Sequence, residues 1–212
     1  MSINNQNLNS IIDHLKSYEN SQLMVVTKNQ SAKDVNDLLS MGFKLFGENR
    51  VQEAKAKYQF LESSNKNIKL HLIGPLQRNK VKIALKVFDA IQSVDRFSLV
   101  DEISKQISKL SDLRTREFYI QVNIGNEDQK FGVPKKDLKD LYYYCVEKKI
   151  SVNGLMCIPP NVSDPSNYFK KMVEIRDEIN KDLKLSMGMS NDYKIALNFK
   201  TNIIRIGSLI FG

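Results

Sequence analysis

Short apolar runs alternate with longer amphipathic segments along almost the whole chain. Each run is rich in valine, isoleucine, leucine or aromatic residues and is bounded by turn-forming or charged residues, which is typical of buried parallel strands. The predicted strands cover residues 23–28, 43–46, 69–73, 89–94, 117–124, 150–158, 184–187 and 202–206. The first of them ends in a single lysine, Lys28, after a run without charge.

The segments between these runs carry apolar residues at helical spacing and predict helices. The predicted helices cover residues 7–19, 31–41, 50–61, 77–87, 96–110, 134–148, 166–182 and 192–199. Ser31 and Asp34 form a capping-box-like pattern, Gly42 suits a helix end, and Pro134 suits a first helical position. Each predicted strand except the last is followed by a helix, and one more helix precedes the first strand.

This alternation predicts a parallel sheet with right-handed crossovers. Eight strand–helix units in 212 residues fit a single-domain α/β fold, a (β/α)8 TIM barrel with an extra N-terminal helix, slightly shorter than the usual ~250 residues. No change of composition divides residues 1–212 into two domains. A doubly wound open sheet is the alternative, and it is disfavoured because no G-x-G-x-x-G follows the first strand.

Composition narrows the setting of the protein. No apolar run is long enough to span a membrane, and the N-terminus lacks the basic and apolar regions of a signal peptide. Cys145 and Cys157 form no C-x-x-C pattern, and Cys157 lies in an apolar run that suits a small core residue. We expect a cytoplasmic protein without a disulfide framework, and a monomer.

The formal net charge of +8 leaves nucleic-acid binding open as a hypothesis. Acidic residues stand between the lysines of the predicted helices, and no arginine-rich tract is present. We therefore interpret the charge as solvated helix faces and expect no nucleic-acid partner. Four basic residues near predicted loop starts would instead make one end of the fold electropositive: Arg50, Arg78, Lys80 and Lys130.

The carboxyl ends of all strands meet at one mouth of a TIM barrel, where ligands bind. Lys28 ends the first predicted strand and Asn49 follows the second, whereas Ser190 follows the seventh and Gly207-Ser208 the eighth. The loops after the last two strands of such barrels frequently bind phosphate, and small polar residues allow close approach of the backbone. The ordinary alternatives are a solvated surface lysine and glycines that only turn the chain.

Arg205 stands among isoleucines in a strand that should be buried. A buried arginine is costly unless it is paired. It could form an ion pair with Glu48 or Asp192, or it could contact a ligand in the barrel mouth, which we favour.

An amine, a phosphate site and an arginine at one mouth match the requirements of pyridoxal 5′-phosphate. The amine attacks the aldehyde only in its neutral form, so we expect Lys28 to be held out of water. An arginine is a known partner type for the pyridine nitrogen of this cofactor. Because it cannot accept a proton from the ring, it makes the ring a poorer electron sink.

From about residue 23 to its end, the chain resembles the pyridoxal phosphate homeostasis protein family and, beyond it, the barrel domain of fold-type III enzymes such as alanine racemase. The matching stretches are 25–28 (VVTK), 46–49 (FGEN), 71–80 (HLIGPLQRNK), 129–132 (QKFG), 154–159 (GLMCIP), 185–192 (LSMGMSND), 205–208 (RIGS) and 210–212 (IFG). Family members usually continue for a few residues beyond the last stretch. We therefore expect a short last helix that leaves one barrel edge less covered.

The resemblance implies pyridoxal 5′-phosphate as cofactor and Lys28 as the aldimine lysine. It implies Ser190, Gly207 and Ser208 near the phosphate. It also implies Asn49 near the ring, and Arg205 at the phosphate or the ring nitrogen.

The resemblance further implies a carrier that takes part in intracellular cofactor homeostasis and delivers the cofactor to apo-enzymes, without strong catalysis or catalytic residues of its own. A racemase or decarboxylase of amino acids is the alternative. A racemase needs a second acid/base, which a C-terminal domain supplies in the racemases resembled here. His14 is expected at the surface and His71 in mid-strand, so neither fills that role, and two distant histidines suggest no metal site.

Overall fold

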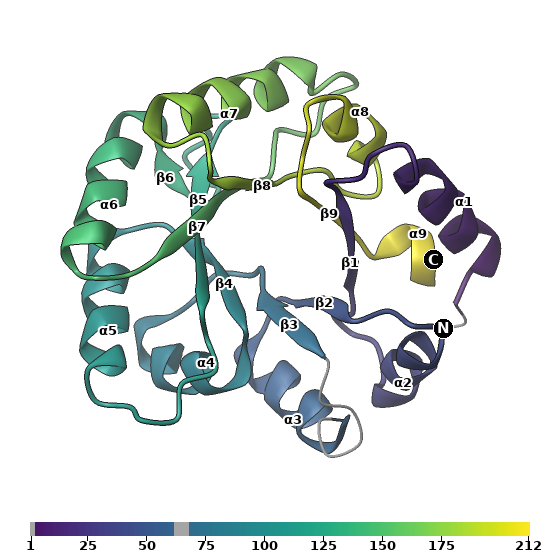
Figure 1. Ribbon diagram of the computed structural model, residues 1–212, viewed down its shortest axis with the longest axis horizontal. Coiled ribbons are helices and arrows are strands. Elements are labelled where there is room, and N and C mark those ends of the chain that lie inside the picture. Colours follow the sequence, from purple (N-terminus) through teal and green to yellow (C-terminus); the bar gives the residue numbers. More distant parts are fainter. Residues whose placement is uncertain (1–2, 62–67) are drawn as a thin grey trace.

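The computed structural model describes residues 3–61 and 68–212, and these form a closed barrel of parallel strands inside a ring of helices (Figure 1). Met1 and Ser2, the start of the N-terminus considered above, lie outside the described residues. The strands are β1 (Gln22–Val26), β2 (Leu45–Glu48), β3 (Lys69–Leu72), β4 (Ala90–Val94), β5 (Glu117–Asn123), β6 (Val133–Pro134), β7 (Val152–Cys157), β8 (Lys184–Ser186) and β9 (Ile203–Ile206).

The helices surround the strands on the outside of the barrel (Figure 1). They are α1 (Asn5–Leu15), α2 (Ala32–Ser40), α3 (Val51–Leu61), the 3-10 turn η1 (Arg78–Lys80), α4 (Val81–Val87), α5 (Phe97–Ile107), α6 (Lys135–Glu147), α7 (Ser166–Ile179), α8 (Tyr193–Asn198) and α9 (Ser208–Phe211). The capping box predicted at Ser31 is present: its hydroxyl accepts from the Asp34 amide, and the Asp34 carboxylate accepts from the Ser31 amide.

Parallel pairing closes the barrel. The strand order runs β4-β3-β2-β1-β9-β8-β7-β5, and a further pairing of β4 with β5 joins its two ends. The predicted (β/α)8 barrel with an N-terminal helix is therefore confirmed, and the open sheet is excluded. Two-residue β6 adds to β5 outside this ring. Pro134 belongs to β6 and caps α6, so its predicted place as the first helical residue is wrong.

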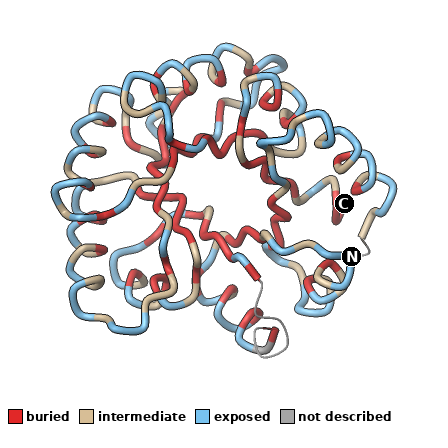
Figure 2. Tube along the Cα trace, viewed as in Figure 1, coloured by how far each residue is buried: buried red, intermediate tan, exposed pale blue. Residues whose placement is uncertain are grey.

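The core has two parts, because successive side chains of a strand point to opposite faces. The larger part lies between strands and helices, and Figure 2 shows the buried strands as the inner ring. A smaller apolar cluster comprises Met24, Ala90, Tyr119, Met156 and Ile203. Cys145 and Cys157 are buried free thiols, and the predicted core position of Cys157 is confirmed.

The last strand is followed by a short helix, which the apolar spacing alone does not predict but the resemblance to the family does. Helix α9 has four residues, and α1 packs beside it (Figure 1). The Asn4 amide donates to the Ile210 carbonyl at 2.8 Å, and the Asn7 side chain donates to the Leu209 carbonyl at 2.9 Å. The expectation of a less covered edge is therefore wrong, because α1 supplies the cover.

Within the described residues, no helix combines the length and the apolar character needed to cross a bilayer.

Candidate functional site

All six residues singled out in the sequence line one cavity of about 320 Å³ at the carboxyl ends of the strands: Lys28, Asn49, Ser190, Arg205, Gly207 and Ser208. Its apolar walls come from Val26, Ile73, Ile158 and Met189. Among the described residues that line it, none is acidic. The structure therefore joins one amine, one guanidinium and two serine hydroxyls in a cavity with apolar walls, a donor set that suits a planar ring with an anionic substituent.

Lys28 lies beyond the end of its strand. Strand β1 ends at Val26, and the chain turns at Asn29, whose φ of 61° is in the left-handed region. Lys28 is an exposed residue, so the expectation that it is held out of water is wrong. Within the described part of the chain its amine takes part in no ion pair or hydrogen bond, and it lines the cavity with Ser190 and Ser208.

The loops after β8 and β9 are joined to each other. The Leu209 amide donates to Ser190 Oγ at 3.4 Å, so the two predicted phosphate loops form one surface. Asp192 shapes the first loop, since its carboxylate accepts from the Met189 amide at 2.5 Å. Gly188 begins that loop with a φ of +95° and leaves no room for a side chain, because a Cβ there would lie 2.6 Å from Ala196 Cβ.

We expect Gly188→Ala to be markedly more destabilising than Gly42→Ala. Both glycines have φ near +90°, but a Cβ at Gly42 meets nothing within 4 Å. Gly42→Ala should cost about 1–2 kcal/mol for the left-handed backbone, and overpacking against Ala196 should add about 1–3 kcal/mol. Urea unfolding of both variants measures the difference. Equal losses of stability in the two variants would show that the β8–α8 loop shifts to accommodate the added methyl group without cost.

Arg205 lies in β9 and is 3% exposed, and its guanidinium reaches the ends of the next two strands, β8 and β7. Its guanidinium donates to Ser186 Oγ at 2.9 Å and to the Cys157 carbonyl at 2.8 Å. Burial lowers the pKa of Arg205, and the charge of Asp192 opposes that shift. Among the described residues neither proposed acidic partner forms an ion pair with it, so the ion-pair alternative is wrong.

A chain of hydrogen bonds continues from Arg205 into the barrel. Ser186 donates to Gln92 Oε1 at 2.7 Å, and Gln92 Nε2 lies 2.9 Å from His71 Nδ1. Arginine can only donate, so every bond of the chain must point away from it. His71 Nδ1 must therefore accept, which leaves the proton on Nε2 and the ring neutral. Ser186 and Gln92 were missed, although each is polar within an apolar strand.

We expect His71 to make stability fall as the pH falls. Burial lowers the pKa of His71 from an ordinary 6.5 to about 4. Below pH 6.5 the imidazole of His71 becomes protonated in the unfolded chain but stays neutral in the folded protein. About 3 kcal/mol of stability is therefore lost between pH 6.5 and pH 4. Urea unfolding across this window should show a shallower loss for His71→Gln than for the wild type. Parallel profiles would contradict a neutral buried ring.

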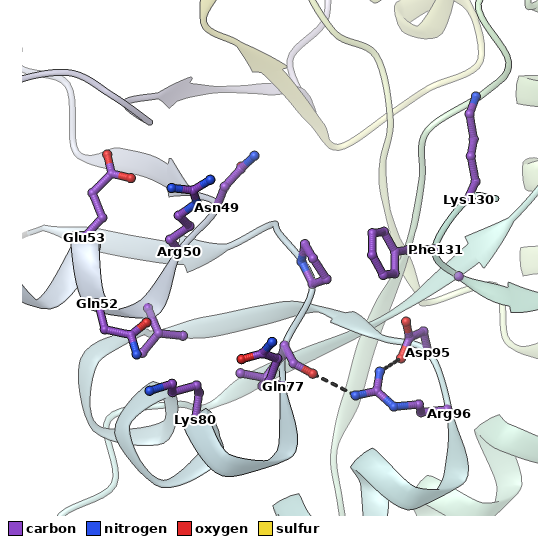
Figure 3. A pocket seen from close by; sticks show the side chains of 14 residues that line it. Asn49, Arg50, Gln52, Glu53, Gln77, Lys80, Asp95, Arg96, Lys130 and Phe131 are labelled. Atoms are coloured by element: carbon purple, nitrogen blue, oxygen red, sulfur yellow. Dashed lines mark hydrogen bonds and ion pairs between the residues drawn. The ribbon is translucent and has the colours of Figure 1, made fainter.

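A wider cavity of about 1210 Å³ opens beside the first and shares Asn49 with it. Arg50, Lys80 and Lys130 line it together with Arg96, which donates to Asp95 at 2.5 Å. The acidic residues Glu53 and Asp95 line it as well, so an electropositive mouth stays a prediction. Figure 3 shows Lys130 and the aromatic ring of Phe131 across the cavity from Asn49 and Arg50. Arg78 is not among the described lining residues and lies 3.9 Å from Glu102.

No family model matches the chain, whereas individual proteins match over most of its length. The pyridoxal phosphate homeostasis protein of Aquifex aeolicus is 38% identical over 201 residues, with 91% of this chain and 86% of that protein covered. The protein of the same name from Escherichia coli is 30% identical over 210 residues, with 93% and 87% covered.

Solved structures also match this chain over most of its length. PipY of Synechococcus elongatus, solved without and with bound PLP, is 29% identical, and the two structures superpose with TM-scores of 0.87 and 0.85 over 98% of this chain and 99% of PipY. Alanine racemase of Bartonella henselae, at 16% identity and a TM-score of 0.74, shares the fold over 95% of this chain and 56% of its own. With both identity and coverage this high among the relatives, the chain belongs to the pyridoxal phosphate homeostasis protein family.

Proposed function

We propose that the protein binds pyridoxal 5′-phosphate (PLP) in the 320 Å³ cavity and holds it as an aldimine of Lys28. The observation that carries this proposal is the convergence of an amine, two serines and an arginine on one cavity without a carboxylate. The PLP bound in PipY supports the choice of ligand. The cofactor would supply an aldehyde that reacts with primary amines. The residues of the cavity would hold the cofactor and orient it.

The joined loops are the proposed phosphate site. Ser190 and Ser208 offer hydroxyls, and Gly207 has no side chain to cover its backbone on the cavity wall. A Cβ at Gly207 would also crowd β1, since it would lie 3.1 Å from the Val26 carbonyl oxygen. The absence of acidic groups among the described lining residues favours a dianion, because a buried like charge would repel it.

Arg205 is proposed to face the ring nitrogen rather than the phosphate. Its guanidinium is held against Ser186 and the Cys157 carbonyl, deeper in the barrel than the loops that follow β8 and β9. A ring whose phosphate lies at those loops would present its other edge to Arg205. Asn49, which follows β2 and lines the same cavity, is proposed to contact the ring.

A carrier fits this cavity better than a racemase or decarboxylase. Racemisation needs a second acid/base opposite Lys28, and no histidine, tyrosine, cysteine or carboxylate is among the described residues lining the cavity. His71 is joined to Arg205 through Ser186 and Gln92, and its Nδ1 is engaged by Gln92. We therefore propose that the protein stores the cofactor and releases it to apo-enzymes. We also propose that free amines compete with Lys28 for the cofactor.

The test is titration of the purified protein with PLP, followed by borohydride reduction and peptide mass mapping. A single pyridoxyl adduct on Lys28 supports the proposal, whereas an adduct confined to another lysine refutes the site. Racemisation and decarboxylation assays at high protein concentration test the alternative. Robust turnover that disappears in Lys28→Ala would overturn the carrier role.

A further inference from the structure

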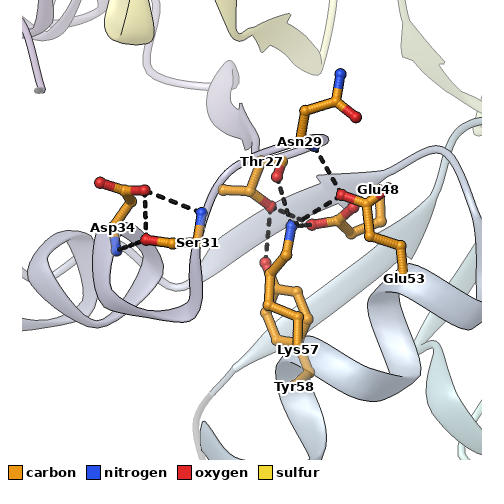
Figure 4. Close-up of polar contacts among 8 residues, drawn as sticks. All are labelled: Thr27, Asn29, Ser31, Asp34, Glu48, Glu53, Lys57 and Tyr58. Atoms are coloured by element: carbon orange, nitrogen blue, oxygen red, sulfur yellow. Dashed lines mark hydrogen bonds and ion pairs between the residues drawn. The ribbon is translucent and has the colours of Figure 1, made fainter. Parts of the chain in front are cut away.

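A polar cluster, buried at Thr27, Glu48, Lys57 and Tyr58, lies directly behind the loop that carries Lys28 (Figure 4). Its members come from the β1–α2 loop, from β2 and from α3, and none of them lines the 320 Å³ cavity. We call this group the α3 clamp, and it comprises Thr27, Asn29, Glu48, Glu53, Lys57 and Tyr58.

The clamp holds the chain immediately before Lys28. Lys57 Nζ donates to the Thr27 carbonyl at 2.6 Å and to Glu48 Oε1 at 2.8 Å. The Thr27 hydroxyl donates to the same Glu48 oxygen at 2.7 Å and lies 2.8 Å from the Tyr58 hydroxyl. Both the backbone and the side chain of Thr27 are therefore fixed from outside the loop.

The same lysine also fixes the chain immediately after Lys28. Glu53 Oε1 accepts from the Asn29 amide at 2.7 Å and from Lys57 Nζ at 3.2 Å. Asn29 has the left-handed φ of 61°, a conformation that asparagine adopts more readily than most residues. The Lys57 ammonium group is thus bonded directly to the Thr27 carbonyl before Lys28 and, through Glu53, to the Asn29 amide after it (Figure 4).

Stability alone does not explain these charges. The Lys57 and Glu48 side chains are 6% and 0% exposed, and Glu48 Oε2 has no hydrogen-bond partner among the described residues. Burial raises the pKa of Glu48, and the hydrogen bonds from Lys57 and Thr27 oppose this increase. A buried ion pair with an unsatisfied oxygen is commonly no more stable than apolar residues of the same volume.

The need to place Lys28 does explain the buried charges of Lys57 and Glu48. Lys28 is exposed, and its own amine is tied to nothing in the described structure, so its position depends on the backbone of Thr27 and Asn29. We propose that Lys57 is a positioning residue, which acts through Glu48, Glu53 and the Thr27 carbonyl to aim the Lys28 amine into the cavity. This inference rests on the proposed function of Lys28 as the attachment site.

The test compares three variants of the 212-residue chain. Lys57→Met removes the central amine, and Glu48→Gln/Lys57→Met removes it without leaving an unpaired buried carboxylate at Glu48. The second variant keeps the test decisive if the first does not fold. Lys55→Met is the matched control, because Lys55 is an exposed lysine of the same helix.

Two measurements are made on each variant. Amide hydrogen exchange without cofactor reports on residues 27–31, with strand β4 (Ala90–Val94) as internal reference. Borohydride trapping of added PLP, with peptide mapping, gives the rate of attachment to Lys28. We expect about tenfold faster exchange at residues 27–31, unchanged exchange in β4, and about tenfold slower attachment, each fold-change corresponding to one lost charge-assisted hydrogen bond. Lys55→Met should match the wild type.

Unchanged exchange at residues 27–31 in a folded variant would overturn the proposal, and so would an equal increase in β4, which indicates a general structural role. An unchanged attachment rate despite a loosened loop would overturn it as well. If wild-type Lys28 takes up no PLP, the proposed function fails instead. The exchange measurement then still decides whether the α3 clamp holds the loop.

Discussion

We expect Lys28→Ala to lose all borohydride-stable attachment of PLP at the cavity, with no measurable change in fold. Lys28 is exposed and makes no ion pair or hydrogen bond within the described residues, so its removal costs the folded state little. The covalent bond, by contrast, has no substitute, because Lys28 is the one lysine among the described residues lining that cavity. Absorbance titration and mass mapping after reduction measure the loss.

Lys28→Arg separates the nucleophile from the charge. Arginine keeps a cation beside Ser190 and Ser208 but cannot form an imine, since its guanidinium stays protonated in proteins. We expect this variant to bind PLP without attachment, and more tightly than Lys28→Ala. Lys33→Ala, at an exposed helix position, serves as the control. Persistent attachment at the cavity in Lys28→Ala would show that another amine reaches it, and the assignment of Lys28 would be wrong.

The parts of the fold that could be predicted depend on local sequence. Ser31 and Asp34 are three residues apart and form the predicted cap, and the spacing of apolar runs gave the number of barrel strands. Barrel closure then brings every strand end to one mouth, which is why residues as distant as Lys28 and Ser208 could be assigned to one cavity.

The missed features depend on contacts that no local pattern encodes. Ser186 and Gln92 are 94 positions apart and meet only because β8 and β4 face each other across the barrel. Lys57 looked like one of many helix-surface lysines, yet α3 turns it inward to Thr27, 30 positions away. The exposure of Lys28 was also missed, because the apolar run gives no sign that the strand ends at Val26.

We expect Arg205→Met to weaken the binding of PLP and of pyridoxal, which lacks the phosphate, by the same factor. A hydrogen bond from a charged group contributes about 1.5–3 kcal/mol, so the loss should be roughly tenfold to 150-fold. An equal loss follows if Arg205 faces the ring nitrogen, which both ligands share. A loss confined to PLP would place the guanidinium at the phosphate instead.

Binding must be separated from folding in this experiment, because Arg205 also has a structural role. Without it the Cys157 carbonyl loses its 2.8 Å donor and Ser186 loses its 2.9 Å donor, which should cost about 1–3 kcal/mol of stability for each group left unpaired. Ser186→Ala is the matched control, since it frees one side of the guanidinium and keeps the cation. Its loss of affinity should be smaller than that of Arg205→Met and again equal for both ligands. If a folded Arg205→Met variant bound both ligands as tightly as the wild type, the guanidinium of Arg205 would have only a structural role and no contact with the cofactor.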